Sequence, residues 1–205
     1  MIATGLQGKA MRATVRTFPA LAALAALAGC VSFGSEPPES LLTLTPTAEA
    51  PAGSGAAGHA AGSLAILVPD APARLDVVRV PVQVSDASLA YLKDAVWVDK
   101  PARLFRTLLA ETIRTRTARV VIDSDDPALT PKTQLRGVLR DFGYDASTSS
   151  VIVRFDAIRD TSDQGIETRR FESIIPGIAP EAAEVGPALN RAANDVAGQV
   201  ADWVG

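Results

Sequence analysis

The fold of this chain is decided by the stretch TQLRGVLRDFGYDASTSSVIVRFD, residues 133–156. Val151, Val153 and Phe155 alternate with Ile152, Arg154 and Asp156, and this period of two predicts a β-strand. Residues 133–144 are predicted as the strand before it. The polar run 145–149 between them predicts a tight turn, so the two strands should be antiparallel neighbours. A further turn at 161–165 and a third strand over 166–175 extend this pattern into a three-stranded meander.

Upstream of the meander, further strand signals occur. Residues 64–68 are a short apolar run closed by proline, which predicts a buried strand. Residues 77–84 alternate Val with Arg, Pro and Gln, and because Pro81 cannot donate a hydrogen bond to a neighbouring strand, we expect an edge strand there. Extended stretches are also predicted for residues 89–98 and 119–122.

Two helices are predicted. The first should be capped by Asp99, with Pro101 in its first turn. The second lies within residues 180–204, where apolar residues repeat at spacings of three and four. Pro187 either kinks this helix or marks its start, and Gly198 should let it approach the sheet closely. The apolar residues on one side of the first helix are Leu104, Phe105, Leu108, Leu109 and Ile113.

These elements predict one α+β domain over residues 64–205, with two helices packed on one face of a mainly antiparallel or mixed sheet. Residues 30–63 precede it as a tether rich in Ala, Gly, Pro and Ser, a composition that cannot bury enough apolar surface to fold alone. Within the tether, Leu42 and Leu44 alternate with threonines in residues 41–46. This alternation predicts a short strand that docks on the domain, and an undocked piece of linker is the alternative.

The first thirty residues have the pattern of a secretory signal, with cations before an apolar run over residues 18–28. The run ends in LAGC at residues 27–30, which resembles the lipobox of bacterial lipoproteins. This resemblance implies that the Cys30 thiol receives a diacylglyceryl group and that cleavage between Gly29 and Cys30 then removes residues 1–29. The new amino group is often acylated too, with palmitate as the expected kind of chain. A buried thiol or an intermolecular disulfide is the alternative, and whether translation starts at Met1 or Met11 stays open.

Removal of the leader leaves 176 residues, and since the leader holds three cations and no acid, 17 basic and 23 acidic residues remain, a net charge of −6. This acidic balance argues against nucleic acid as a partner. No polybasic run follows the lipobox, which argues against electrostatic docking on anionic lipid. With one cysteine in the chain, no disulfide is possible within the mature protein.

Residues suited to catalysis are sparse. The single histidine, His59, lies in the tether, where nothing holds it in a fixed geometry, and Cys30 is expected to carry lipid. Asp123, Asp125 and Asp126 could be offered as metal ligands, but their loop lacks the glycine and distal glutamate of an EF-hand. A solvated turn is the better interpretation, so we expect no enzyme, no metal and no cofactor apart from the covalent lipid.

Two carboxylates could meet on adjacent strands of the predicted meander, Asp156 and Glu172. Paired carboxylates can serve acid–base chemistry, but Arg154 and Arg170 lie close to both in sequence. Cross-strand ion pairs therefore explain the pattern more simply.

Several motifs, taken in order, resemble the ABC-type transport auxiliary lipoproteins, the family that includes the lipoprotein partner of the paraquat-inducible system. Leu41 and Leu42 replace the tyrosines usual in that family. The resemblance covers residues 41–204. The matching motifs are LLTLTP (41–46), LDVVR (75–79), Tyr91 followed by VWVDKP (96–101), LFRTLL (104–109), LRGVLRDF (135–142) and Trp203 near the end of the last helix.

The resemblance implies a non-catalytic subunit of an intermembrane transport system that moves phospholipid or a similar hydrophobic cargo. Its partners would be an MCE-type periplasmic protein, a permease and an ATPase. Tyr91 and Trp97 are candidate contact residues, although core packing is the alternative for Trp97. Val31 after the lipidated cysteine favours the inner leaflet of the outer membrane, facing the periplasm. Cargo, direction of transport and assembly into a homo-oligomer stay open.

Two other functions are compatible with the sequence. One is a carrier that itself holds a lipid between helices and sheet, which needs a large apolar cavity. The other is an outer-membrane biogenesis lipoprotein that acts as a chaperone for a β-barrel.

Overall fold

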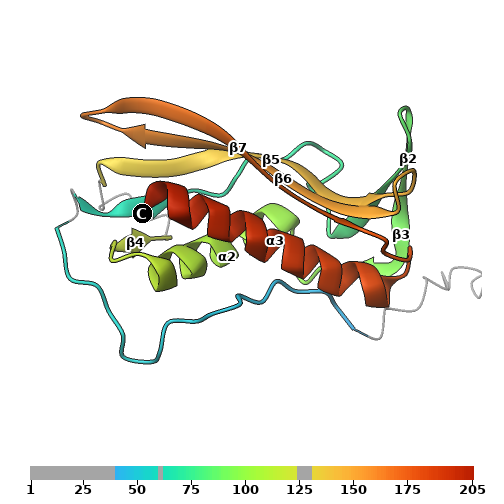
Figure 1. Cartoon of the computed structure of the whole chain (residues 1–205), viewed down its shortest axis with the longest axis horizontal. Helices are drawn as coiled ribbons and strands as arrows, with labels where there is room; N and C mark the ends of the chain where they lie inside the picture. Colours follow the sequence, from blue (N-terminus) through green and yellow to red (C-terminus); the bar gives the residue numbers. More distant parts are fainter. Residues whose placement is uncertain (1–39, 60–61, 124–130) are drawn as a thin grey trace, which may run out of the picture. The chain divides into compact units, whose positions relative to one another are not determined.

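A mixed β-sheet of seven strands is covered on one face by two helices (Figure 1). This arrangement confirms the predicted α+β fold. The computed structural model describes residues 40–59, 62–123 and 131–205. The predicted signal sequence and the predicted lipobox, with Gly29 and Cys30, lie outside the described residues. Within the described part of the chain, no helix combines the length and the apolar character needed to cross a membrane.

The bounds of the elements follow the sequence patterns closely. The strands are β1 (Leu64–Ile66), β2 (Arg79–Ser85), β3 (Ser88–Val96), β4 (Val121–Ile122), β5 (Thr133–Asp145), β6 (Ser150–Thr161) and β7 (Gly165–Pro176); the helices are α2 (Pro101–Arg116) and α3 (Ala182–Val204).

Strand β5 is the centre of the sheet. Along one side it pairs with β6, which in turn pairs with β7, and both pairings are antiparallel. The predicted meander is therefore confirmed. Along its other side, β5 pairs in parallel with β1 near its start and with β2 near its end. Strand β4 adds to β1 in parallel, and β3 pairs with β2 in an antiparallel hairpin.

The prediction that Pro81 marks an edge strand is wrong, because β2 lies between β3 and β5. A register shift between Arg79 and Pro81 accommodates the missing N–H on the β3 side. On the other side, pairing with β5 begins only at Val82. Opposite the proline stands Gly143, where an added Cβ would lie 2.5 Å from the Pro81 carbonyl oxygen. An interior strand thus tolerates this proline because both neighbours adapt to it.

Aromatic rings fill the layer between the sheet and the helices. Trp97 and Phe142 meet edge to face with ring centroids 5.5 Å apart, and Phe105 continues the contact to Phe155 at 5.3 Å. All four rings are buried. Such T-shaped pairs add stability beyond the burial of apolar area. The core is therefore built from side chains of the sheet and of α2, with the alanine-rich face of α3 packed beside them.

The helix ends differ in detail from the predictions. Helix α2 has Lys100 at its N-cap position, and Asp99 instead accepts a hydrogen bond from the Lys100 N–H at 2.7 Å. Pro187 lies inside α3 and does not mark its start. The expectation for Gly198 is also wrong. An added Cβ there would lie 3.0 Å from Nη1 of Arg116, so this glycine makes room for a side chain of α2, not for the sheet.

Candidate interaction surface

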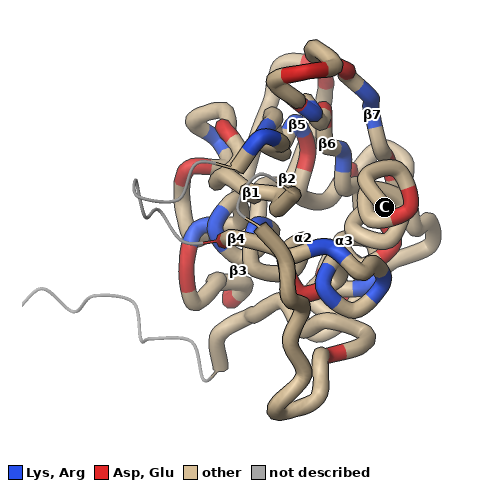
Figure 2. The backbone as a smooth tube through the Cα atoms, turned by 90° about the vertical axis from the view of Figure 1, so that its left-hand side faces the viewer, with Lys and Arg blue, Asp and Glu red and all other residues tan. Residues whose placement is uncertain are grey.

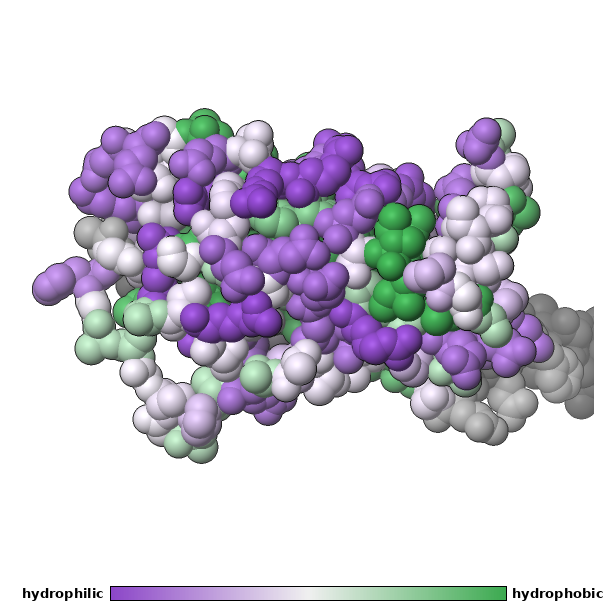
Figure 3. All heavy atoms as spheres, viewed as in Figure 1, coloured by the Kyte–Doolittle hydropathy of each residue, from purple (hydrophilic) through white to green (hydrophobic). Residues whose placement is uncertain are grey.

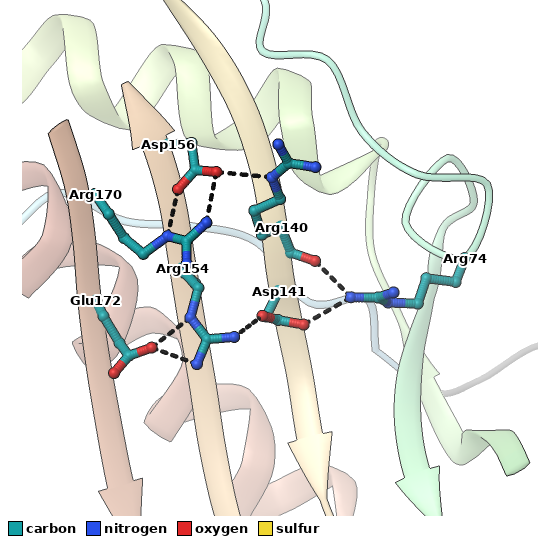
Figure 4. Close-up of polar contacts among 7 residues, drawn as sticks. All are labelled: Arg74, Arg140, Asp141, Arg154, Asp156, Arg170 and Glu172. Carbon is teal, nitrogen blue, oxygen red and sulfur yellow. Dashed lines mark hydrogen bonds and ion pairs between the residues drawn. The ribbon is translucent and has the colours of Figure 1, made fainter. Parts of the chain in front are cut away.

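The face of the meander that is turned away from the helices carries a network of ion pairs, which we call the lattice (Figure 4). Even-numbered residues of β6 and β7 point to this face, because the odd-numbered ones, such as Phe155 and Phe171, are buried against the helices. Basic and acidic residues are interspersed along these strands (Figure 2). The members of the lattice are Arg74, Arg140, Asp141, Arg154, Asp156, Arg170 and Glu172.

One row of the lattice crosses three strands in register. Asp141 on β5 faces Arg154 on β6, and Arg154 faces Glu172 on β7. The Arg154 guanidinium donates hydrogen bonds to both carboxylates. The predicted cross-strand pairing of Arg154 with Glu172 is thus confirmed, and Asp141 extends it by one strand.

The second row lies beside the first and has the opposite order of charges. Arg170 donates to Asp156 through Nε and Nη2, at 2.6 Å and 2.8 Å, and Arg140 donates to the same carboxylate through Nε at 2.8 Å. These hydrogen bonds, first those from Arg170, hold the pKa of Asp156 well below its usual range. A carboxylate held so firmly as an anion is poorly suited to transfer protons near neutral pH.

Arg74, from the loop before β2, ties this face to the rest of the sheet. Its Nη2 lies 2.6 Å from the Asp141 carboxylate and 2.6 Å from the Arg140 carbonyl oxygen. The sequence patterns do not predict this contact. The two partners of Arg74 lie 66 and 67 residues away, so no local pattern could have indicated it.

A small hollow of about 260 Å³ adjoins the lattice, where the β2–β3 hairpin meets β5 and β6. Gln83, Leu89 and Ile152 line it, together with Arg74 and Arg154. Leu89 is 40% exposed, so an apolar edge borders the charged rows. The space-filling view shows an apolar patch toward the β2–β3 end of a mostly hydrophilic surface (Figure 3). This hollow is smaller than typical small-molecule sites, and the surface is better suited to contact with a macromolecule.

Of the predicted contact residues, only one is open to solvent. Tyr91 is half-buried, and the Arg79 guanidinium lies 4.5 Å from its ring centroid. Trp97 is 1% exposed, so it packs in the core, which is the alternative considered for it. Trp203 is half-buried, with its ring centroid 5.6 Å from that of Phe171.

The residues weighed for catalysis or metal binding do not come together. His59 is exposed. Asp123 forms an ion pair with Arg114 at 2.9 Å, while Asp125 and Asp126 lie outside the described residues. Among the residues that the structure does describe, no three His, Cys, Asp or Glu side chains form a cluster that could hold a metal ion.

Residues 41–50, which we call the strap, lie along the helices on the side away from the sheet (Figure 1). The strap includes the segment 41–46, for which the alternation predicts a docking strand. Leu42 forms a single β-bridge with Trp97. The Leu42 side chain packs against Gly186 of α3, where an added Cβ would lie 2.7 Å from its Cδ2. The strap is therefore in contact with both the end of β3 and the start of α3.

Beyond Leu42, side chains of the helices bind the backbone of the strap. Asn190 Oδ1 accepts a hydrogen bond from the Thr45 N–H at 2.8 Å, and Asn194 Oδ1 accepts one from the Thr47 N–H at 2.8 Å. Asn194 also donates through Nδ2 to the Thr45 carbonyl oxygen at 2.9 Å. The predicted docking strand is thus reduced to the bridge at Leu42, where the Leu42 N–H donates to the Val96 carbonyl oxygen at 2.7 Å. Farther along the strap, the backbone groups of Thr45 and Thr47 bond to side-chain amides of α3 and not to a neighbouring strand.

Comparison with known proteins places this arrangement in a known group. The sequence model of the family described as ABC-type transport auxiliary lipoprotein component matches residues 42–201. A crystal structure of an uncharacterized protein has a TM-score of 0.61 at 14% identity, covering 70% of this chain and 93% of that one. A crystal structure from Xanthomonas campestris has a TM-score of 0.60 at 18% identity, covering 69% and 83%. At these identities the likeness shows the fold alone. No match was found among curated proteins.

Proposed function

Because this chain belongs to the family of ABC-type transport auxiliary lipoprotein components, we propose that it is a lipid-anchored, non-catalytic docking subunit of an MCE-type ABC transport system. The system would move phospholipid or a similar hydrophobic cargo between membranes. The observation that carries the proposal is the extent of the family match. Residues 42–201 include all but the first residue of the strap, the whole sheet, all of α2 and most of α3, and the predicted lipobox ending at Cys30 precedes them.

The proposed anchor is the lipidated Cys30, exposed as the new N-terminus after cleavage behind Gly29. Two or more acyl chains would give stable attachment, since one chain binds a membrane only weakly. Val31 favours the periplasmic leaflet of the outer membrane. Only residues 31–41 separate this anchor from Leu42, the first residue of the strap that pairs with the domain. Eleven residues reach at most about 40 Å when fully extended, so the domain would remain near the bilayer.

The proposed role is mechanical. The charged groups of the lattice neutralise one another in fixed geometry, which suits recognition of a partner surface better than chemistry on a substrate. The domain would bind the periplasmic end of an MCE protein whose permease and ATPase lie in the inner membrane, and would hold it beside the outer membrane. Tyr91 is the candidate contact residue that solvent can reach. The covalent lipid would be the only attached group.

Crosslinking in intact cells tests this role. A photoreactive amino acid is introduced in place of Tyr91, the cells are irradiated, and crosslinked partners are identified by mass spectrometry. We expect an MCE-domain protein or the permease among the crosslinked products, and we expect these products to be lost in the unanchored Cys30→Ser variant. Crosslinks to a β-barrel protein alone would support a role in outer-membrane biogenesis instead.

A further inference from the structure

The last strand of the meander has one open side. In the part of the chain that the structure describes, β7 pairs only with β6. The Glu172 carbonyl oxygen accepts a hydrogen bond from Gln199 Nε2 at 3.2 Å, which shows that this carbonyl points away from β6. Because alternate residues of an antiparallel strand direct their backbone groups to the same side, the N–H and C=O groups of Thr168, Arg170 and Ile174 face the open side as well.

The charges of the lattice end at this open side with an alternating order. Across the sheet, one row reads anion, cation, anion and ends at Glu172, whereas the next row reads cation, anion, cation and ends at Arg170. The Arg170 side chain is 61% exposed and that of Glu172 is 36% exposed. A third row, Ile152 opposite Ile174, is apolar, and Ile174 is 49% exposed. Each row could continue onto one more strand.

We propose that β7 accepts an antiparallel strand from a partner protein, with an apolar residue opposite Ile174, a cation opposite Glu172 and an anion opposite Arg170. Strand β6 already presents this order to β7 from the other side, through Ile152, Arg154 and Asp156. Opposite charges placed directly across a strand pair stabilise the pairing, and like charges destabilise it. The rows therefore select both the register and the composition of the added strand.

The space beside β7 is open on the helix side as well. A hollow of about 300 Å³ lies between β7 and α3, lined by Phe171, Gln199, Asp202 and Trp203 together with Arg169 and Arg170. Successive residues of a strand point to opposite faces. The residue of the added strand that lies between its cation and its anion would thus point into this hollow, opposite Phe171. Gln199 would give up its bond to the Glu172 carbonyl oxygen, and an N–H of the added strand would replace it.

This inference names the surface through which the proposed docking subunit would bind its partner. It rests on the proposed function only for the identity of the protein that supplies the added strand. Addition of a strand to an exposed edge is a common way for one protein to bind an extended segment of another. Charged edge residues can also serve only to prevent such pairing. The experiment therefore has to separate a binding edge from a protected one.

The probe is a synthetic peptide with Ile, Arg and Asp at alternate positions, separated by Thr and followed by two further Thr residues, so that its last residue lies opposite Thr168. Its binding to the full-length protein is measured by fluorescence anisotropy. The control peptide has the same composition with Arg and Asp exchanged. We expect the first peptide to bind at least about fivefold more tightly than the control. Equal affinities, or no binding of either peptide at millimolar concentration, would overturn the proposal and leave the edge as a protected one.

Two variants and hydrogen exchange locate the binding. Thr168→Pro removes an N–H that faces the open side and leaves the pairing with β6 intact, so peptide affinity should fall roughly tenfold. Thr168→Val keeps that N–H and should bind as the wild type does. With peptide bound, the amides of Arg170 and Glu172 should gain protection, while those of Arg169 and Phe171 stay unchanged. Protection that appears with protein concentration and without peptide would point to a second copy as the occupant and contradict the inference. Because these assays contain no transport component, their failure would leave the crosslinking test of the docking role unaffected.

Discussion

Replacement of Asn194 by alanine should release the strap from the helices without unfolding the domain. The Asn194 side chain accepts hydrogen bonds from the N–H and the hydroxyl of Thr47, both at 2.8 Å, and donates one to the Thr45 carbonyl oxygen at 2.9 Å. The variant loses all three bonds to the strap. The core beneath is untouched, because these contacts are on the surface of the protein.

The expected size of the effect follows from those three contacts. A hydrogen bond contributes about 0.5–1.5 kcal/mol net, with exposed bonds at the lower end. The free energy of strap opening should therefore fall by roughly 1.5–3 kcal/mol. Since about 1.4 kcal/mol corresponds to a factor of ten, the protection of the Thr47 amide should drop about ten- to a hundredfold. Because 1 kcal/mol corresponds to about 2–4 °C for a domain of this size, the melting temperature should fall by roughly 3–12 °C.

Hydrogen exchange followed by NMR or mass spectrometry measures this protection directly. Asn190→Ala is the matched control, because that side chain contributes one bond, from the Thr45 N–H at 2.8 Å. Its effect should be about three- to tenfold. The reasoning is refuted if Asn194→Ala leaves exchange at Thr47 unchanged, or if the wild-type amide already exchanges at the rate of an unfolded chain.

Three further predictions concern stability and anchoring. Hydrogen bonds from Arg170 and then Arg140 depress the pKa of Asp156 in the folded protein. The resulting stabilisation is present above the unfolded pKa of about 3.9 and is lost as pH falls below it. Asp156→Asn should thus cost roughly 1 kcal/mol at pH 7 and less at pH 3 in urea unfolding; an equal loss at both pH values would be inconsistent with this. Gly137→Ala should destabilise the domain by about 3 kcal/mol, because the added Cβ would lie 2.1 Å from the Asp156 carbonyl oxygen. Gly55→Ala, with nothing within 4 Å of the added Cβ, should leave the melting temperature unchanged, and similar melting temperatures for the two variants would refute the steric argument. Cys30→Ser should abolish incorporation of labelled palmitate into the protein, and equal labelling of the variant would argue against a lipid anchor on that thiol.

The local part of the fold could be predicted from the sequence. The alternation in residues 151–156 and the polar turn before it specify a hairpin with little dependence on the rest of the chain. The ion pairs between Arg154 and Glu172 and between Asp156 and Arg170 follow from the same register. These features were predictable because strand period and turn chemistry act over a few residues.

The remaining features depend on contacts between distant parts of the chain. The missing N–H of Pro81 is a local property and predicts an edge strand, whereas the neighbour that accommodates it, Gly143, lies on another strand. The contact between Arg74 and Asp141 joins residues 67 positions apart, and the contact between Thr47 and Asn194 joins residues 147 apart. No periodicity in one segment encodes such pairs, so the contacts that hold the strap to α3 and the complete lattice became visible only in the folded structure.

Purification of the lipidated protein from native envelopes in mild detergent tests the central claim most directly. Co-purifying proteins are measured by quantitative mass spectrometry against a mock purification. The account predicts enrichment of an MCE-domain protein with its permease and ATPase. Enrichment of a β-barrel protein with none of these three would contradict it.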